Sequence, residues 1–388
     1  MSDVSIKAFN TSIFDRVLDG GSFEEKRNLT EQLGLLACDM ESARVERDAI
    51  VPTLLRLAVD PIKGIRSLLA SILVRAVELH PDLVFSIIAD DEDISLPFLA
   101  ETPALDRLRT LAVLKVGDKA RQLVLASREG LADEAIKYIV ENCDSEVCSA
   151  LLDNEKIEVN TQNYRRLYVR FRDVPEIIEQ LLDRHDLPLE VRILQAKRAS
   201  NNVHKLMAER GWIPANDAEE IIVDAEETTL LKILSSAKQN ELDGLIPFLS
   251  SKNLLTPSLI LRAALSNKLA IVSRAIAYLS STPMVKLERM FADNAVMAIK
   301  SSYNKAGLPK SCFHIIRAAL DASNELKEVP DRLAKQQFGP RLVEYLMTRY
   351  SSVSAQDKSM LLEIVGRLSD ENTRALARRL AEQFKLAA

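Results

Sequence analysis

The sequence contains no apolar run that approaches the roughly eighteen residues of a membrane-spanning helix, and no two of its four cysteines have CxxC spacing. Four scattered cysteines in 388 residues exclude a disulfide framework and are typical of reduced, mostly buried thiols. The first residues, MSDVSIKAFNTSIFDRVLDGG, have no long apolar core behind a basic flank, so we expect no secretory signal. Together these absences predict a cytoplasmic protein without a membrane span.

Glycine and proline are also scarce, at 11 and 14 residues, and aromatic residues make up only 5% of the chain. Leu, Ala, Ile, Glu and Arg dominate instead, and most of these favour helices. Hydrophobic residues reach 47%, which is enough for a folded core. No excess of positive charge exists, because 51 basic and 56 acidic residues give a net charge of −5. A dedicated nucleic-acid binder usually carries such an excess, so this balance argues against one.

Helical periodicity extends along nearly the whole chain, and a repeat of helix pairs stands out between residues 118 and 200. One set of segments begins at Asp118, Asp144 and Asp173, and each aspartate is expected to cap the helix that it opens. The other set begins every 28 residues, at Leu131, Val159 and Leu187. Such pairs bury their apolar faces by stacking on one another. The pattern predicts an all-α fold, a HEAT-like α-solenoid of short helix pairs with additional C-terminal helices.

Local signals place several helix boundaries. Ser22 and Glu25 match a capping box. Three Thr-Pro pairs, each able to cap a helix and to begin its first turn, start at Thr102, Thr256 and Thr282. We expect four parts: N-terminal helices that cap the array in residues 1–50, HEAT-like repeats in residues 51–215, a further helical part in residues 216–330 and a C-terminal helical extension in residues 331–388.

The segment NYRRLYVRFRD, which begins at Asn163, combines four arginines with three aromatic residues. On a helix its apolar positions share one face: Tyr164, Leu167, Tyr168 and Phe171. One interpretation is a stripe packed against neighbouring repeats, with solvated arginines that pair with nearby acidic residues. The other is a basic ridge that binds nucleic acid, although single-strand binders expose their aromatic side chains. The candidate residues of this ridge are Arg165, Arg166, Arg170, Arg172, Arg192 and Arg198.

Two later segments have a distinctive charge pattern. Residues 217–243 hold eight acidic residues against two lysines, which predicts a helix with Ile221, Ile222 and Ala225 turned inward and a solvated acidic face. An acidic docking surface is the alternative. At the C-terminus an apolar stripe of Leu376, Leu380 and Phe384, flanked by Ala377 and Ala381, runs beside Arg374, Arg378 and Arg379. This helix is expected to cap the array, and packing against a second copy of the chain is the alternative.

Signatures of catalysis are scarce. The four histidines are scattered and form no HExxH motif. Cys312 and His314 are two residues apart on a predicted helix, so their side chains diverge and Cys312 is expected in the core. Two SxxK matches lack the motifs that accompany them in β-lactamase-like enzymes, and no glycine-rich phosphate loop is present. We therefore assign no catalytic, metal-binding or cofactor-binding residue, and expect no cofactor and no enzymatic activity.

The stretch LLTPSLILRAALSNKLAIVSRAIAYLSSTPMVKLERMF, together with AIKSSYNKAGLPKSCFHIIRAALD, resembles the bacterial family known as domain of unknown function 2336. The resemblance covers roughly residues 55–325, and its most specific parts are Leu255-Thr256-Pro257 and the turn from Lys305 to Pro309. It implies a helical-repeat protein of bacteria and leaves the activity open.

The YNKAGLP turn within this resemblance has two interpretations. In the structural one, Gly307 ends a helix in the left-handed conformation and Pro309 begins the next helix. In the functional one, Tyr303, Asn304 and Lys305 lie beside an exposed helix N-terminus and bind an anionic group. The structural interpretation is preferred.

The sequence therefore predicts a non-catalytic scaffold that binds a protein or peptide partner, because stacked repeats offer an extended surface and need no catalytic group. The alternative is a HEAT-like protein that binds nucleic acid through the arginine-rich helix face, which net acidity disfavours. A homodimer formed through the C-terminal helices is a further hypothesis.

Overall fold

The computed structural model describes residues 11–39, 44–210, 215–348, 355–369 and 371–387. Within these ranges the chain forms 23 α-helices, one 3-10 turn at Lys310–Cys312 and no strand, so the predicted all-α fold is confirmed. The chain divides into two compact units, residues 1–188 and 189–388. The division into four parts and the solenoid arrangement stay predictions.

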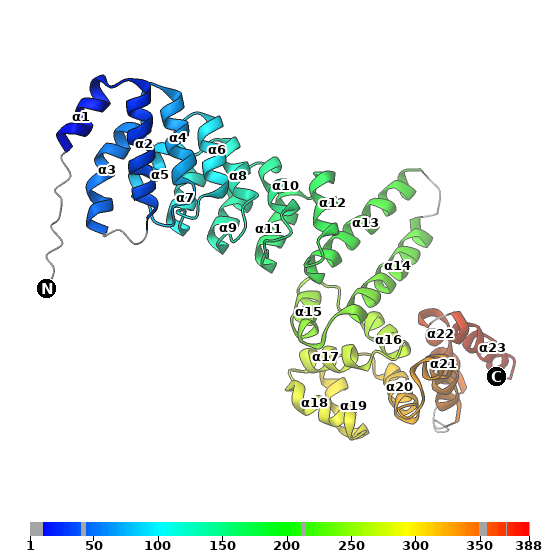
Figure 1. The fold of residues 1–388 in the computed structure, drawn as a ribbon. Coiled ribbons are helices and arrows are strands. Elements are labelled where there is room, and N and C mark those ends of the chain that lie inside the picture. The colour runs from blue at the N-terminus through cyan, green and yellow to red at the C-terminus, as the bar shows by residue number, and fades with distance from the viewer. Residues whose placement is uncertain (1–10, 40–43, 211–214, 349–354, 370, 388) are drawn as a thin grey trace, which may run out of the picture. The chain divides into compact units, whose positions relative to one another are not determined.

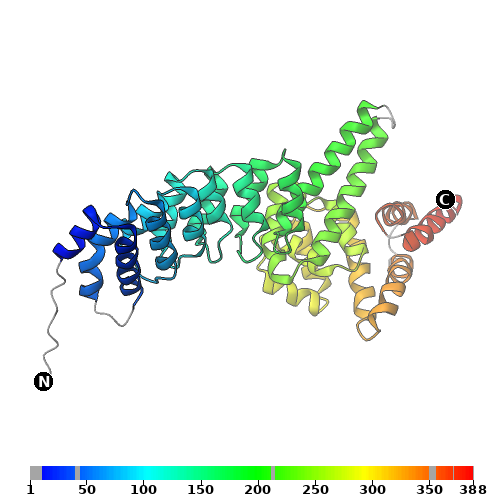
Figure 2. The same cartoon turned by 45° about the horizontal axis from the view of Figure 1, so that its top comes forward.

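Helices of the first unit alternate between two rows (Figures 1 and 2). The first row consists of α2 (Phe23–Cys38), α4 (Lys63–Leu73), α6 (Glu92–Glu101), α8 (Lys119–Ala126), α10 (Ser145–Asp153) and α12 (Pro175–Asp183). The second row consists of α3 (Arg44–Ala58), α5 (Pro81–Ile88), α7 (Arg107–Val116), α9 (Asp133–Asn142) and α11 (Thr161–Phe171), and α1 (Thr11–Gly20) packs against α2 and α3. In the first row each helix packs against the next, and in the second row α3 packs against α5, and α9 against both α7 and α11.

The apolar interior of the first unit repeats from helix to helix. Along the first row, one leucine of each of four successive helices is fully buried: Leu69, Leu99, Leu125 and Leu151. None of these short helices could bury such a face alone, so each depends on its neighbours in the row. The predicted period is confirmed, since α9, α11 and α13 (Leu189–Glu209) begin 28 residues apart.

Polar caps fix the start of several of these helices. The Asp118 and Asp144 side chains accept the backbone N–H three residues later, at 3.0 and 3.1 Å, as predicted. The predicted capping box at Ser22 is also present. The prediction for Asp173 is wrong, because Val174 occupies the cap position of α12 and Asp173 pairs with Arg172.

The prediction that Thr102 begins a helix is also wrong. Thr102 ends α6, where its N–H donates to the Phe98 carbonyl, and its buried hydroxyl accepts the Ala104 N–H at 3.2 Å. The next helix, α7, begins instead after Asp106, whose carboxylate accepts the Arg109 N–H at 2.8 Å. A carboxylate accepts this bond with a full charge, which makes it the stronger cap of the two.

The second unit starts with two long helices, α13 and α14 (Ala215–Ser236), which pack side by side (Figure 1). The remaining helices are α15 (Gln239–Ser251), α16 (Pro257–Leu265), α17 (Leu269–Ser280), α18 (Met284–Ala292), α19 (Val296–Lys305), α20 (Phe313–Glu325), α21 (Asp331–Thr348), α22 (Ala355–Leu368) and α23 (Glu371–Ala387). The centre of this unit is α16, which is buried from Leu259 to Leu265 and contacts α14, α17, α20 and α22.

Helix starts in the second unit agree only partly with the Thr-Pro signals. Thr256 caps α16 as predicted, because its hydroxyl accepts the Leu259 N–H at 3.1 Å. Thr282 does not cap α18, whose cap position is Pro283.

Several helices of this unit end in the same way, with a residue in the left-handed conformation. Five successive helices, α15 to α19, are each followed by a residue with positive φ: Asn253, Asn267, Ser281, Asn294 and Gly307. After the first four of these helices, the next N–H donates to the carbonyl five residues earlier, as in Leu254 to Leu249 at 2.8 Å. The predicted role of Gly307 is confirmed by its φ of 73°.

The inward face of α14 differs from the predicted one. Ile221 is 53% exposed and Ala225 is also exposed, whereas Glu227, Leu230 and Leu234 are buried. The buried Glu227 carboxylate accepts hydrogen bonds from Arg262 and Thr256, so an acidic residue lies in the interface with α16. The side chains of residues 211–220 lie outside the described part of the chain.

The last three helices approach one another closely at two glycines. A Cβ atom on Gly339 of α21 would overlap the Thr373 hydroxyl of α23, and one on Gly366 of α22 would lie 3.1 Å from the Arg378 Cγ. Ala377 and Ala381 of α23 are buried, and Leu376 and Leu380 are half-buried. The Phe384 side chain lies outside the described part of the chain. The described part of the predicted stripe thus packs within the unit.

Candidate functional site

The arginine-rich segment forms α11, and its apolar face is buried as predicted. Tyr164, Leu167, Tyr168 and Phe171 are all buried in the first unit. Arg165 and Arg166 are half-buried, and Arg170 and Arg172 are exposed. The aromatic side chains are therefore not available for bases to stack on.

Three arginines of this helix have partners within the fold. The Arg166 guanidinium donates to Glu141 at 3.0 Å and to Asn163 at 2.9 Å. Arg170 donates to the Val140 carbonyl at 2.8 Å and lies over its own neighbour Phe171. Arg172 lies 3.5 Å from the Asp173 carboxylate. These contacts neutralise or occupy the charges that a nucleic-acid ridge would need.

The other two predicted ridge residues, Arg192 and Arg198, lie on α13 in the second unit and are half-buried. The structure therefore brings Arg165, Arg166, Arg170 and Arg172 together on α11 and its C-terminal cap, and the last two arginines belong to the other unit. The buried Arg192 Nε has no hydrogen-bond partner among the described residues.

A polar cluster that the sequence analysis missed lies beneath α11. The Tyr164 hydroxyl donates to Asp186 at 2.6 Å and accepts from the Arg184 Nε at 3.0 Å. The buried Arg184 guanidinium also donates to three carbonyl oxygens, those of Leu152, Asn154 and Ile157, at 3.3, 2.9 and 2.7 Å. Burial, reinforced by the bond to Asp186, raises the pKa of Tyr164.

Arg184 is one of several arginines that bind carbonyl oxygens about one repeat upstream. Arg121 donates to the Ile88 carbonyl at 2.7 Å, and Arg128 donates to the carbonyls of Leu99 and Thr102. Each of these acceptors lies at or near the end of a helix, where carbonyls lack partners within their own helix. These arginines therefore join successive repeats.

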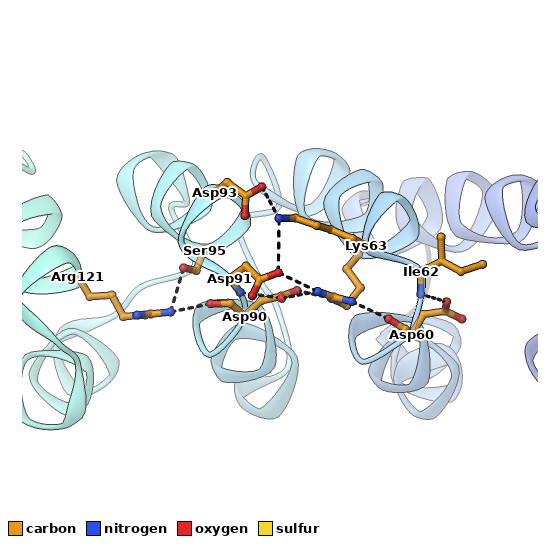
Figure 3. A network of polar contacts seen from close by, with 9 residues as sticks. Asp60, Ile62, Lys63, Asp90, Asp91, Asp93, Ser95 and Arg121 are labelled. Atoms are coloured by element: carbon orange, nitrogen blue, oxygen red, sulfur yellow. Dashed lines mark hydrogen bonds and ion pairs between the residues drawn. The ribbon is translucent and has the colours of Figure 1, made fainter.

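Acidic turns extend these connections into a network (Figure 3). Arg66 donates to the Asp90 carboxylate at 2.8 Å and to the Asp60 carbonyl at 2.9 Å. Lys63 bridges Asp91 and Asp93 at 3.5 and 2.7 Å. Two helix pairs later, Lys119 bridges Asp144 and Glu146 in the same way, at 3.4 and 2.5 Å. The recurrence at equivalent turns identifies the network as part of the framework.

The YNKAGLP turn is closed by its tyrosine. The Tyr303 ring is buried 5.3 Å from the Phe313 ring, and its hydroxyl donates to the Pro309 carbonyl at 2.9 Å. Asn304 and Lys305 are exposed. Because the Tyr303 hydroxyl points into the turn, these three residues do not converge on one point, and the structural interpretation explains the contacts.

The four cysteine side chains are buried or, for Cys38, half-buried. Burial raises the pKa of all four thiols, that of Cys148 to about 12, which leaves them protonated and weakly nucleophilic at neutral pH. Within the described ranges, no three His, Cys, Asp or Glu side chains lie close enough together to hold a metal ion. None of the described helices is both long and apolar enough to cross a membrane.

Large apolar side chains are exposed along the second row of the first unit. Leu108 and Val116 of α7 are 76% and 89% exposed, and Val169 of α11 is 65% exposed. Val45 of α3 and Phe85 of α5 are exposed as well. These residues were not predicted, since their signal in the sequence is only an isolated apolar residue on the polar side of a helix.

Comparison with known families identifies the chain. Residues 94–356 match the model of an uncharacterised protein conserved in bacteria, DUF2336. The chain belongs to the DUF2336 family. The match begins within α6, later than the start near residue 55 that the sequence motifs indicated, and ends in the first residues of α22, beyond the indicated end near residue 325. It includes α7 to α12 of the two-row stack. No curated protein and no solved structure matches the chain.

Proposed function

We propose that this chain is a non-catalytic helical-repeat scaffold that binds a protein or peptide partner in the bacterial cytoplasm. The observation that carries the proposal is the exposure of large apolar side chains on four of the five helices of the second row, α3, α5, α7 and α11, above all Leu108, Val116 and Val169. Contiguous exposed apolar patches mark protein interaction sites, and we propose that these side chains form one.

The polar groups of the first unit support the same conclusion. Its cysteines and Tyr164 are at least half-buried, and its arginines connect helices to one another. The framework thus uses most of the groups that could otherwise bind or transform a small substrate. The exposed surface of the first unit is therefore the best candidate for its function.

The face around Val169 indicates the chemistry of the partner. Arg165 and Arg172 lie four residues before and three residues after Val169, so the three side chains share one side of α11. An apolar side chain between arginines fits a partner segment with an apolar residue flanked by acidic ones. Nucleic acid is the competing ligand, and the intramolecular contacts of Arg166 and Arg170, together with the buried aromatic side chains of α11, make it the weaker candidate.

Photo-crosslinking in the native bacterium tests the proposal. A photoreactive amino acid replaces Leu108 or Val169 in the full chain, and Leu35 serves as the control because it is 64% exposed on the first row. We expect a discrete, nuclease-resistant protein adduct from positions 108 and 169 and none from position 35.

A charged substitution on the proposed surface provides a second test. The Val169→Asp substitution should reduce the adduct formed at position 108 by at least about tenfold, which corresponds to 1.4 kcal/mol of binding free energy. Because Val169 is exposed, the substitution should leave the fold intact. Equal adducts from all three positions would refute a specific surface, and an adduct lost with nuclease would favour nucleic acid.

A further inference from the structure

A basic hollow of about 950 Å³ lies within the second unit. Its walls come from the C-terminal half of α14, from the turn between α16 and α17, and from the junction of α22 and α23. Besides Arg262, four basic side chains line it: Lys232, Lys268, Arg374 and Arg378. These residues are far apart in the sequence and meet only because α16 packs against both α14 and α22.

The four cations have no acidic partner among the described residues. Arg374 donates only to the backbone carbonyls of Arg367 and Ser369, at 3.4 and 3.1 Å, and its buried Nε has no hydrogen-bond partner. Among the described residues of the lining, Glu371 is the single acidic one. This arrangement contrasts with the first unit, where arginines are engaged by acids and carbonyls. Unpaired cations around one hollow attract an anion.

A fifth basic side chain, Arg262, forms part of the wall and is already neutralised. The buried Arg262 donates to Glu227 at 2.8 Å and to Asp224, and Glu227 also accepts from Thr256 at 2.6 Å. This pair fixes α14 against α16, so the wall that carries Lys232 and Lys268 is held by hydrogen bonds. Because this wall is rigid before a ligand binds, binding costs less conformational entropy.

Further features of the lining suit phosphate oxygens. Ser235 and Ser266 line the hollow with hydroxyl groups that have no partner within the described ranges. Lys268 occupies the cap position of α17, so this helix, with the positive end of its dipole, begins at a residue that lines the hollow. Both features add donors and positive potential to the four cations.

The shape and lining define the class of ligand. The volume matches sites for small organic molecules, roughly 300–1,000 Å³. No aromatic side chain of the described ranges lines the hollow, so these residues offer no platform for a stacked base. We propose that the basic hollow binds a small molecule with two or more phosphate groups and recognises mainly those groups.

Calorimetric titration of the full chain with inorganic triphosphate and orthophosphate tests this assignment. We expect triphosphate to bind at least about tenfold more tightly than orthophosphate, because several cations act on it at once. The double variant Lys232→Ala/Lys268→Ala should weaken triphosphate binding by at least about tenfold.

A matched control removes two lysines of the same unit that do not line the hollow. Lys252 and Lys286 are exposed, so the variant Lys252→Ala/Lys286→Ala has the same net charge as the test variant. It should retain triphosphate affinity within about twofold, since distant exposed charges are screened by salt. Absent binding of triphosphate, equal losses in both double variants, or equal affinity for the two anions would each overturn the proposal. The result is independent of the proposed protein-binding surface, which lies in the other unit.

Discussion

At the scale of single residues, arginine in the first unit serves the fold more than the surface. Arg121, Arg128 and Arg184 bind carbonyl oxygens near the ends of helices in the preceding repeat. Such carbonyls have no partner within their helix, and a charged donor makes a stronger hydrogen bond than a neutral one. The many arginines of the first unit, which could suggest a ligand-binding surface, therefore serve largely to connect its repeats.

The Arg184→Met substitution should lower the free energy of unfolding by about 3 kcal/mol, because it leaves Asp186, Tyr164 and three buried carbonyls without their shared donor. Urea titration of the full chain measures the effect. The Arg172→Ala variant is the control, since Arg172 is exposed and makes one contact of 3.5 Å. We expect it to change stability by less than about 0.5 kcal/mol.

Acidity provides an internal check on the Arg184 effect. Burial raises the pKa of Asp186, but its hydrogen bonds from Arg184 and Tyr164 outweigh burial, so the pKa lies below its ordinary value. The stability linked to a lowered carboxyl pKa is present above the unfolded-state pKa and is lost as the pH falls through the folded-state pKa. The difference between wild type and Arg184→Met should therefore be smaller near pH 3 than at pH 7. A difference of equal size at both would assign the loss to packing alone.

The sequence predicted some of these residues and not others for a physical reason. The buried face of α11 follows from its spacing alone, because residues three and four apart share a side of a helix. The role of Arg184 does not, since its carbonyl acceptors lie 27 to 32 residues upstream and backbone groups leave no mark in the sequence. The basic hollow was missed likewise, because Lys232, Lys268 and Arg374 belong to three separate segments.

At the scale of helices, caps were predictable where one side chain dominates. Asp118, Asp144 and Thr256 cap as their patterns indicate. Thr102 fails because the carboxylate of Asp106 offers a better cap four residues later. Three helix ends have asparagine at the residue with positive φ: Asn253, Asn267 and Asn294. Asparagine tolerates this conformation, so the sequence carries a signal there, but only the glycine at position 307 was predicted to end a helix in this way.

The close contact between α21 and α23 gives a prediction at this scale. The Gly339→Ala substitution places a methyl group onto the Thr373 hydroxyl, so α23 must shift away from α21. We expect a loss of at least about 2 kcal/mol in the free energy of unfolding, which chemical denaturation monitored by circular dichroism would measure.

Gly244 of α15 supplies the matched control. It is exposed within its helix and nothing lies within 4 Å of an added Cβ, so Gly244→Ala should stabilise the chain by about 0.5–1 kcal/mol through the helix propensity of alanine. If both alanine variants shift stability in the same direction, the contact with Thr373 does not limit the packing of α21.

At the scale of the whole molecule, the chain consists of two units with separate interiors. The 28-residue period continues up to the start of α13, where the first long helix begins. Sequence patterns predicted where helices lie but not which of them share a core, because the latter depends on contacts between distant segments. For this reason the boundary between the two units was not predicted. It falls between residues 188 and 189, inside the region 51–215 that was predicted as one array of repeats.

Two interiors should unfold in two steps. We expect differential scanning calorimetry of the full chain to show two transitions, since each unit buries its own apolar residues. Arg184→Met should lower the temperature of one transition and Gly339→Ala that of the other, because the two residues belong to different units. A loss of 2 kcal/mol in a unit of this size corresponds to a shift of roughly 4–8 °C. If both variants lower the same transition by similar amounts, the units unfold as one, and the family domain, which spans residues 94–356 and so includes parts of both, is a single cooperative structure.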